Sequence, residues 1–122
     1  MFSINIKDVK DDLKRKVSLV ELKGKLDMVS SPSLSSEIIA LVDQGEIYFV
    51  LDMDNLEYID SAGIYTLLQC YTRLKEKKGF LKLVKLNKNV GDILSSIGVT
   101  KILLTYNTIE DALNPVRDNE KD

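Results

Sequence analysis

The first forty residues carry two runs of apolar residues with the spacing of β-strands. Residues 2–6 alternate apolar and polar side chains, the pattern of a half-buried strand. Residues 17–22 form a second, more apolar run that stops at Gly24. The charged stretch 8–16 between them predicts a turn. We therefore predict an antiparallel hairpin at this end of the chain.

Helical spacing follows in two longer segments. Ser31 suits an N-cap and Pro32 suits the first helical position, and the apolar residues after them recur every three to four positions until Gly45. A second amphipathic helix is predicted over residues 61–77. Its inward face consists of Ile64, Leu67, Leu68, Tyr71 and Leu74.

An unbroken apolar run, residues 47–51, lies between these helices and is typical of a strand covered on both faces. Residues 52–60 follow it as an acidic loop. The remaining predicted elements are strands at 80–86 and 102–105 and short helices at 87–97 and 108–113. We expect Ile97 to point inward from the first of these short helices.

Strands and helices alternate after the opening hairpin. Connections of this length join parallel strands, so the order predicts an α/β fold with a mixed, mostly parallel sheet. A chain of 122 residues leaves little room for a second domain. We predict one domain over residues 1–113 and a disordered polar tail over residues 114–122.

The composition narrows the possible functions. The sequence contains no histidine, which excludes a Ser-His-Asp triad and zinc sites built on imidazole. The single cysteine, Cys70, excludes an internal disulfide, and we expect it to be a small core residue. The net charge is −2 and basic residues are spread along the chain, which argues against a nucleic-acid surface. We expect a protein that is not an enzyme and that needs no metal and no cofactor.

Two further features bear on the location of the protein. No apolar run approaches the roughly 20 residues of a membrane span. The first residues lack the basic segment and apolar stretch of a signal peptide. We expect a cytoplasmic protein that does not enter a membrane.

Ser61 is the main candidate for a functional residue. It follows a buried strand and the acidic loop, and it begins the second helix, where free N–H groups and the helix dipole favour an added phosphate. The residues alone favour a simpler interpretation, because Asp and Ser are ordinary helix caps. Asp60 or Ser61 would then cap the helix, and the loop would be a solvated connection.

Three short motifs resemble signatures of the STAS domain of anti-sigma factor antagonists. The tetrapeptide Asp60-Ser61-Ala62-Gly63 resembles the phosphorylation loop of that family, while residues 50–54 and 24–27 resemble two other signatures. The likeness in order and length covers residues 1–113. It implies a STAS-like domain with an N-terminal antiparallel hairpin and about four helices, mainly on one face of the sheet.

The resemblance also implies a partner-switching cycle. The unphosphorylated protein would bind an anti-sigma factor that is a serine kinase with a GHKL-type ATPase fold, and so release the sigma factor. Phosphorylation of Ser61 would end that complex, and a metal-dependent serine phosphatase would reset it. Many family members carry a second hydroxyl at the position of Ala62, so Ser61 is left as the only acceptor in this loop.

The resemblance places the partner surface around Ser61. In the family fold, the loop after the second strand lies beside the phosphorylation loop. The candidate partner-binding residues are Asp27, Met28, Ser30, Tyr58, Asp60, Ser61, Ala62, Gly63 and Tyr65. Asp27 is open to a second interpretation, as a turn residue that caps the following helix. Ile64 suits the core better, whereas Tyr65 lies off the apolar stripe and should be exposed.

Two alternatives from other functional classes stay open. The first is a STAS scaffold or accessory subunit, in a stress-signalling or lipid-transport assembly, without modification of Ser61. The second is a domain that binds a small ligand or a nucleotide at the same helix N-terminus. Identification of partners would separate the first alternative, and nucleotide protection in a thermal shift assay would support the second.

Overall fold

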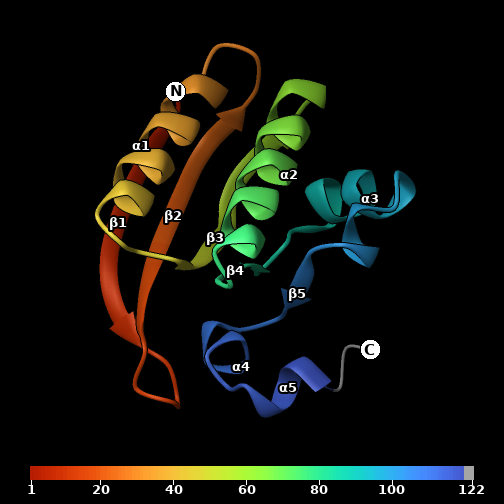
Figure 1. The fold of residues 1–122 in the computed structure, drawn as a ribbon. Helices are drawn as coiled ribbons and strands as arrows, with labels where there is room; N and C mark the ends of the chain where they lie inside the picture. The colour runs from red at the N-terminus through yellow and green to blue at the C-terminus, as the bar shows by residue number, and fades with distance from the viewer. Residues whose placement is uncertain (120–122) are drawn as a thin grey trace.

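The protein is built on one five-stranded sheet. A computed structural model describes residues 1–119. The strands follow chain order across the sheet, and only the first pair is antiparallel (Figure 1). They are β1 (Ser3–Lys10), β2 (Lys16–Leu26), β3 (Tyr48–Ile59), β4 (Phe80–Val84) and β5 (Leu104–Tyr106). This topology confirms the predicted mixed sheet with its N-terminal hairpin.

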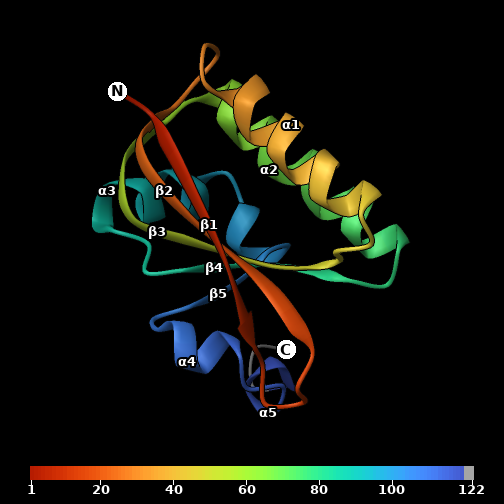
Figure 2. The ribbon, with the colours of Figure 1, turned by 90° about the vertical axis from the view of Figure 1, so that its left-hand side faces the viewer.

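The three longest helices cover one face of the sheet. They are α1 (Ser31–Asp43), α2 (Ser61–Glu76) and α3 (Lys88–Ser96), and their buried side chains share one core with strand residues. A 3₁₀ turn, Val99–Lys101, follows α3. Two short helices, α4 (Ile109–Ala112) and α5 (Val116–Asn119), lie on the opposite side of the sheet (Figure 2). Within residues 1–119, no helix has the length and apolar character needed to cross a membrane.

The alternation of side chains along the strands separates these two layers. On β4, Leu81 and Leu83 face the core under α1, α2 and α3, whereas Val84 belongs to a second, smaller cluster that includes Ala112 of α4. Lys82 points to the side of that second cluster, because neighbouring strand residues face opposite ways. The sheet is therefore covered on both faces at its centre, as the unbroken apolar run 47–51 indicates.

The predicted acidic loop at residues 52–60 is wrong for most of its length. The strand continues to Ile59, because its backbone pairs with the end of β2 as far as Leu26. The pairing shifts twice, and each time β3 carries one residue more than β2. The buried residues Met53, Leu56 and Ile59 therefore recur every third position. That spacing hides the strand from a search for strict alternation.

Three smaller predictions also need correction. Ser30, and not Ser31, occupies the N-cap position of α1, and its side chain makes no capping bond there. Ile97 follows the end of α3 and is 56% exposed. The strand predicted from residue 102 begins at Leu104, because a 3₁₀ turn occupies the residues just before it.

The C-terminal segment also differs from the predicted disordered tail. Residues 116–119 form α5, and Asp118 makes an ion pair with Lys82 on the sheet. The polar residues of this segment thus have a charged partner that the local sequence does not reveal. The end of the predicted tail, residues 120–122, lies outside the described residues.

Asn87 fastens α3 to the long strand β3. Its side-chain oxygen accepts a hydrogen bond from the Val90 N–H at 2.9 Å, and its side-chain nitrogen donates to the Leu56 carbonyl at 2.6 Å. Asn89 makes a similar but more exposed contact with the Glu57 carbonyl, at 3.3 Å. The two asparagines therefore hold the part of β3 that extends beyond β4.

We expect Asn87→Ala to lower the free energy of unfolding by about 1–3 kcal/mol, because it removes a helix cap and leaves a strand carbonyl without its donor. Asn89→Ala is the matched control, and we expect a loss of about 0.5 kcal/mol or less because its bond is long and exposed. Urea denaturation monitored by circular dichroism measures both. Equal effects would show that Asn87 is not the principal link.

Candidate functional site

Asp60 joins the start of α2 to the loop between β2 and α1. It is the N-cap of α2 and has an extended backbone, with φ −110° and ψ −173°. One carboxylate oxygen accepts a hydrogen bond from the Gly63 N–H at 3.0 Å. The other accepts from the Met28 N–H at 3.2 Å. Both oxygens are therefore engaged in fixing two neighbouring loops in one arrangement.

Gly63 lets α2 begin directly against the end of β2. A Cβ atom at this position would lie 2.4 Å from the Leu26 carbonyl oxygen and 2.8 Å from a side-chain carbon of Ile59. The same Leu26 carbonyl accepts a hydrogen bond from the Asp60 N–H at 3.2 Å. Only glycine fits this contact without displacement of the backbone.

Ser61 is the first residue of α2 and is exposed. Across residues 1–119, its hydroxyl group has no hydrogen-bond partner. The N–H groups of Ser61 and Ala62 belong to the first helical turn, which has no intrahelical acceptor for them. An anion attached to the Ser61 oxygen would lie next to these donors and to the positive end of the helix dipole.

Asp27 and Ser30 organise the β2–α1 loop from within. The Asp27 carboxylate accepts hydrogen bonds from the N–H groups of Val29 and Ser30, at 3.0 and 3.1 Å. The Ser30 hydroxyl donates to the Lys25 carbonyl at 2.6 Å and accepts from the Asp27 N–H. The Ser30 N–H bond is the main reason that the pKa of Asp27 is lowered. Asp27 is therefore a turn residue that holds the loop before α1, but it does not cap the helix, whose N-cap position is occupied by Ser30.

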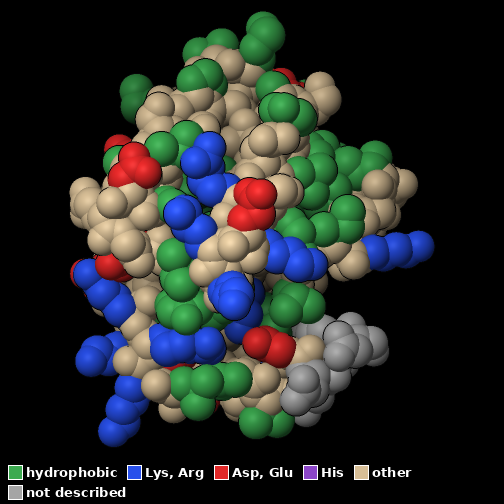
Figure 3. Space-filling view, in the orientation of Figure 1, with side chains coloured by type: hydrophobic (Ala, Val, Ile, Leu, Met, Phe, Trp, Pro, Cys, Tyr) green, Lys and Arg blue, Asp and Glu red, His purple; other side chains and the backbone are tan. Residues whose placement is uncertain are grey.

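The organised loop presents apolar side chains to solvent. Met28 is 74% exposed and Val29 is 84% exposed at its tip. Tyr65 lies one helical turn after Ser61 on the same side of α2 and is 64% exposed, while Tyr58 near the end of β3 is 42% exposed. Figure 3 shows hydrophobic side chains interspersed with other side chains at the top of the molecule, where the loop and the first turn of α2 lie, and Lys and Arg side chains lower on that face.

The structure separates the candidate residues by exposure. Met28, Ser61 and Tyr65, with the neighbouring Val29, are exposed and form what we call the Ser61 surface. Tyr58 is exposed as well, but it precedes Ile59 on β3, and Ile59 packs in the core beneath the helices, so Tyr58 points to the other face of the sheet. The other candidates lie inside or partly inside the loops and hold their shape: Asp27, Ser30, Asp60, Ala62 and Gly63. Ile64 packs against the core, as predicted. The link from Asn87 to β3 was not predicted, because no local pattern in the sequence indicates it.

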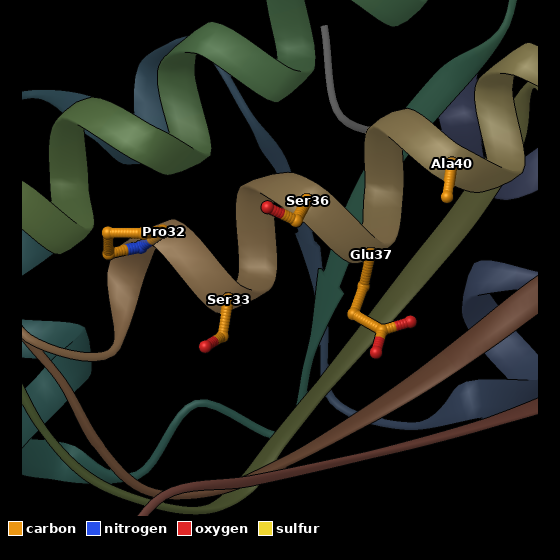
Figure 4. Close-up of a pocket in the computed structure, with 5 residues that line it drawn as sticks. All are labelled: Pro32, Ser33, Ser36, Glu37 and Ala40. Atoms are coloured by element: carbon orange, nitrogen blue, oxygen red, sulfur yellow. The ribbon is translucent and has the colours of Figure 1, made fainter.

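Two of the depressions on the surface lie on or beside α1. One, of about 460 Å³, is lined entirely by α1 residues: Pro32, Ser33, Ser36, Glu37 and Ala40 (Figure 4). Another, of about 230 Å³, lies between α1 and α2 and includes Tyr65 and Cys70. Burial raises the pKa of the Cys70 thiol to about 11, so this sulfur is a thiol near neutral pH. Neither depression is lined by Ser61.

The fold and these motifs belong to a known family, and the chain is a member of the STAS domain family. The family model of the STAS domain matches residues 6–112. A Bordetella bronchiseptica protein that bears the name anti-sigma factor antagonist BtrV is 33% identical over 91 residues, which cover 75% of this chain and 78% of that protein.

Solved structures agree with this assignment. An anti-sigma factor antagonist from Mycobacterium paratuberculosis has a TM-score of 0.79 at 26% identity, over 93% of this chain and 92% of that one. The Bacillus protein SpoIIAA has been solved unphosphorylated, with a TM-score of 0.69, 16% identity and 98% coverage of both chains. Its phosphorylated form gives 0.68, 18% identity and coverage of 90% and 96%. These last two likenesses establish the shared fold.

We expect Gly63→Ala to lower the free energy of unfolding by about 1–3 kcal/mol, since its methyl group would overlap a backbone carbonyl. Gly91→Ala is the matched control within α3, where a Cβ would meet its nearest neighbour at 3.6 Å. There we expect a gain of up to about 1 kcal/mol from the better helix former. Urea denaturation compares the two, and a neutral Gly63→Ala would refute the close contact.

Asp27 should titrate below the ordinary aspartate pKa of about 3.9. Because the folded-state pKa is lowered, the stability that the carboxylate contributes is present above the ordinary value and is lost as the pH falls through the folded-state pKa. Carbon-13 NMR of the Asp27 side-chain carboxyl group gives the midpoint directly. A midpoint at or above the ordinary value would mean that the loop hydrogen bonds do not favour the ionised form.

Proposed function

We propose that this protein is an anti-sigma factor antagonist whose binding is switched by phosphorylation of Ser61. Membership of the STAS family and the names of the relatives support the antagonist role. The observation that carries the switch is the position of Ser61. Its exposed hydroxyl group lies at the start of α2, in the middle of an exposed apolar surface that includes Met28 and Tyr65.

In this proposal the Ser61 surface binds an anti-sigma factor while the hydroxyl is neutral. Met28, Val29 and Tyr65 supply apolar contact area, and bound aromatic residues contribute strongly to protein interfaces. The rigid β2–α1 loop favours tight binding, because Asp27 and Asp60 already hold it in one arrangement and little ordering is needed.

Phosphorylation would act at the interface and leave the fold intact. A phosphate adds roughly 1.5 to 2 negative charges, which the first-turn N–H groups of α2 can accommodate. A partner docked over Ser61 would have to bury that charge beside the Asp60 carboxylate. A penalty of about 2.7 kcal/mol would weaken the complex about a hundredfold.

The proposed partners follow from the same cycle. An anti-sigma factor that is a serine kinase with a GHKL-type ATPase fold would bind and phosphorylate the protein, using ATP and magnesium held by the kinase. A metal-dependent serine phosphatase would remove the phosphate, and the cycle would run in the cytoplasm. SpoIIAA, which shares the fold, is known in both phosphorylated and unphosphorylated forms.

Affinity capture from the lysate of the source organism tests the switch. The baits are wild type, Ser61→Ala, Ser61→Asp and a control, Ser36→Asp. The control adds the same charge at an exposed position on α1, outside the Ser61 surface. We expect every bait except Ser61→Asp to capture a small GHKL-type kinase, with a loss of about a hundredfold in affinity for Ser61→Asp. Mass spectrometry identifies the partners and locates phosphate on the purified wild type.

Other outcomes would favour the alternatives. Identical partners for wild type and Ser61→Asp would refute the switch, and recovery of a large multi-subunit assembly would favour a scaffold role. Stabilisation of the free protein by nucleotide in a thermal shift assay would favour ligand binding at the α2 N-terminus.

A further inference from the structure

A buried lysine on the other face of the sheet has no part in the proposed switch. Lys82 lies in the middle of β4 and is 2% exposed. Its neighbours on the strand, Leu81 and Leu83, face the core under α1 and α2. Lys82 therefore points to the opposite face, beneath α4 and α5.

The surroundings of Lys82 form a complete binding site for one carboxylate. Its ammonium group donates to the Ala112 carbonyl at 2.9 Å and to the two oxygens of Asp118 at 2.9 and 3.1 Å. The Tyr106 hydroxyl group donates to the same Asp118 carboxylate. The rings of Phe80 and Tyr106 flank the ammonium group, at 4.3 and 5.4 Å from the ring centres. Burial and the neighbouring Asp118 raise the pKa of Tyr106, which keeps this hydroxyl a donor.

Stability alone does not account for a lysine at this position. Val84 and Ala112 are completely buried nearby, and a buried ion pair is often no more stabilising than apolar residues of similar volume. An apolar residue could not recognise a carboxylate. The Lys82 ammonium group and the Tyr106 hydroxyl group can, because both donate to the same carboxylate next to the aromatic rings.

The carboxylate in this site, that of Asp118, belongs to a short segment whose one apolar side chain is mostly exposed. Asp118 lies on α5, a single helical turn that follows Pro115. Val116, the apolar residue of that turn, is 65% exposed. A second ion pair, between Arg117 and Asp111, is longer at 3.7 Å and is partly exposed. Asp118 links α5 to the buried side chains of Lys82 and Tyr106.

We propose that Lys82 and Tyr106 form a carboxylate-binding site on this face, and that Asp118 is its internal ligand. When α5 moves away, the site accepts another carboxylate, because Lys82 would otherwise keep an unpaired charge in an apolar pocket. The ligand is a carboxylate group, either of a small molecule or of an acidic side chain on another protein. This site lies across the sheet from α2 and is independent of the Ser61 switch.

Chemical rescue in the full-length chain tests the proposal. Asp118→Ala removes the internal ligand and leaves Lys82 and Tyr106 in place. We expect sodium formate, raised to about 0.5 M at constant ionic strength against sodium chloride, to increase its Tm by about 2–5 °C more than that of wild type. A short peptide with one central aspartate, compared with its asparagine counterpart, distinguishes a side-chain ligand from a small molecule.

Two variants serve as controls. Asp111→Ala removes the carboxylate of the more exposed ion pair and should respond to formate as wild type does. Lys82→Met combined with Asp118→Ala removes the site and should lose the specific response. If Asp118→Ala is unfolded at room temperature, formate should restore its circular dichroism spectrum, and the isosteric Asp118→Asn provides a second host.

An equal effect of formate and chloride on Asp118→Ala and Asp118→Asn would overturn the proposal. So would a formate response that survives in the double variant, since Lys82 would then not be the receptor. Neither result bears on partner capture by Ser61, so the two proposals fail independently.

Discussion

The architecture of the Ser61 surface depends on the close contact between the start of α2 and the end of β2. Gly63 permits it, because any side chain would overlap the Leu26 carbonyl. Asp60 completes it, since its two carboxylate oxygens bind the N–H groups of Gly63 and Met28. With these groups engaged, the Ser61 hydroxyl remains exposed at the junction, beside the N–H groups of the first turn of α2. An exposed hydroxyl group is thus presented on a rigid frame.

Much of this arrangement could be predicted from local sequence signals. The positions of α1 and α2 follow from apolar spacing, from the Pro32 start and from the glycines after each helix. Asp60 is a recognisable cap, so the placement of Ser61 at a helix N-terminus needed no tertiary information. These features could be predicted because each signal lies within a few residues of the element that it marks.

The structural features that were not predicted depend on contacts between residues that are distant in sequence. The extension of β3 through residues 53–59 requires the end of β2 as a pairing partner, and two bulges remove the alternation that would have marked it as a strand. Lys82 was predicted only as part of a strand, and Asp118 as part of a disordered polar tail. Each is explained only by the other, 36 residues away. A search confined to local patterns cannot detect such a pair.

The two polar sites follow one rule, the high cost of an unpaired charge away from water, but apply it in opposite ways. Ser61 is neutral and exposed, so in the proposed switch a phosphate would cost the fold little and a bound partner much. Lys82 is already charged and buried, and Asp118 offsets that cost within the chain. Under the two proposals, addition of charge would be the signal at the α2 N-terminus, whereas the Lys82 site would exchange one anion for another. The same sheet can carry both because its two faces are covered by different helices, so that a change at one site leaves the packing at the other intact.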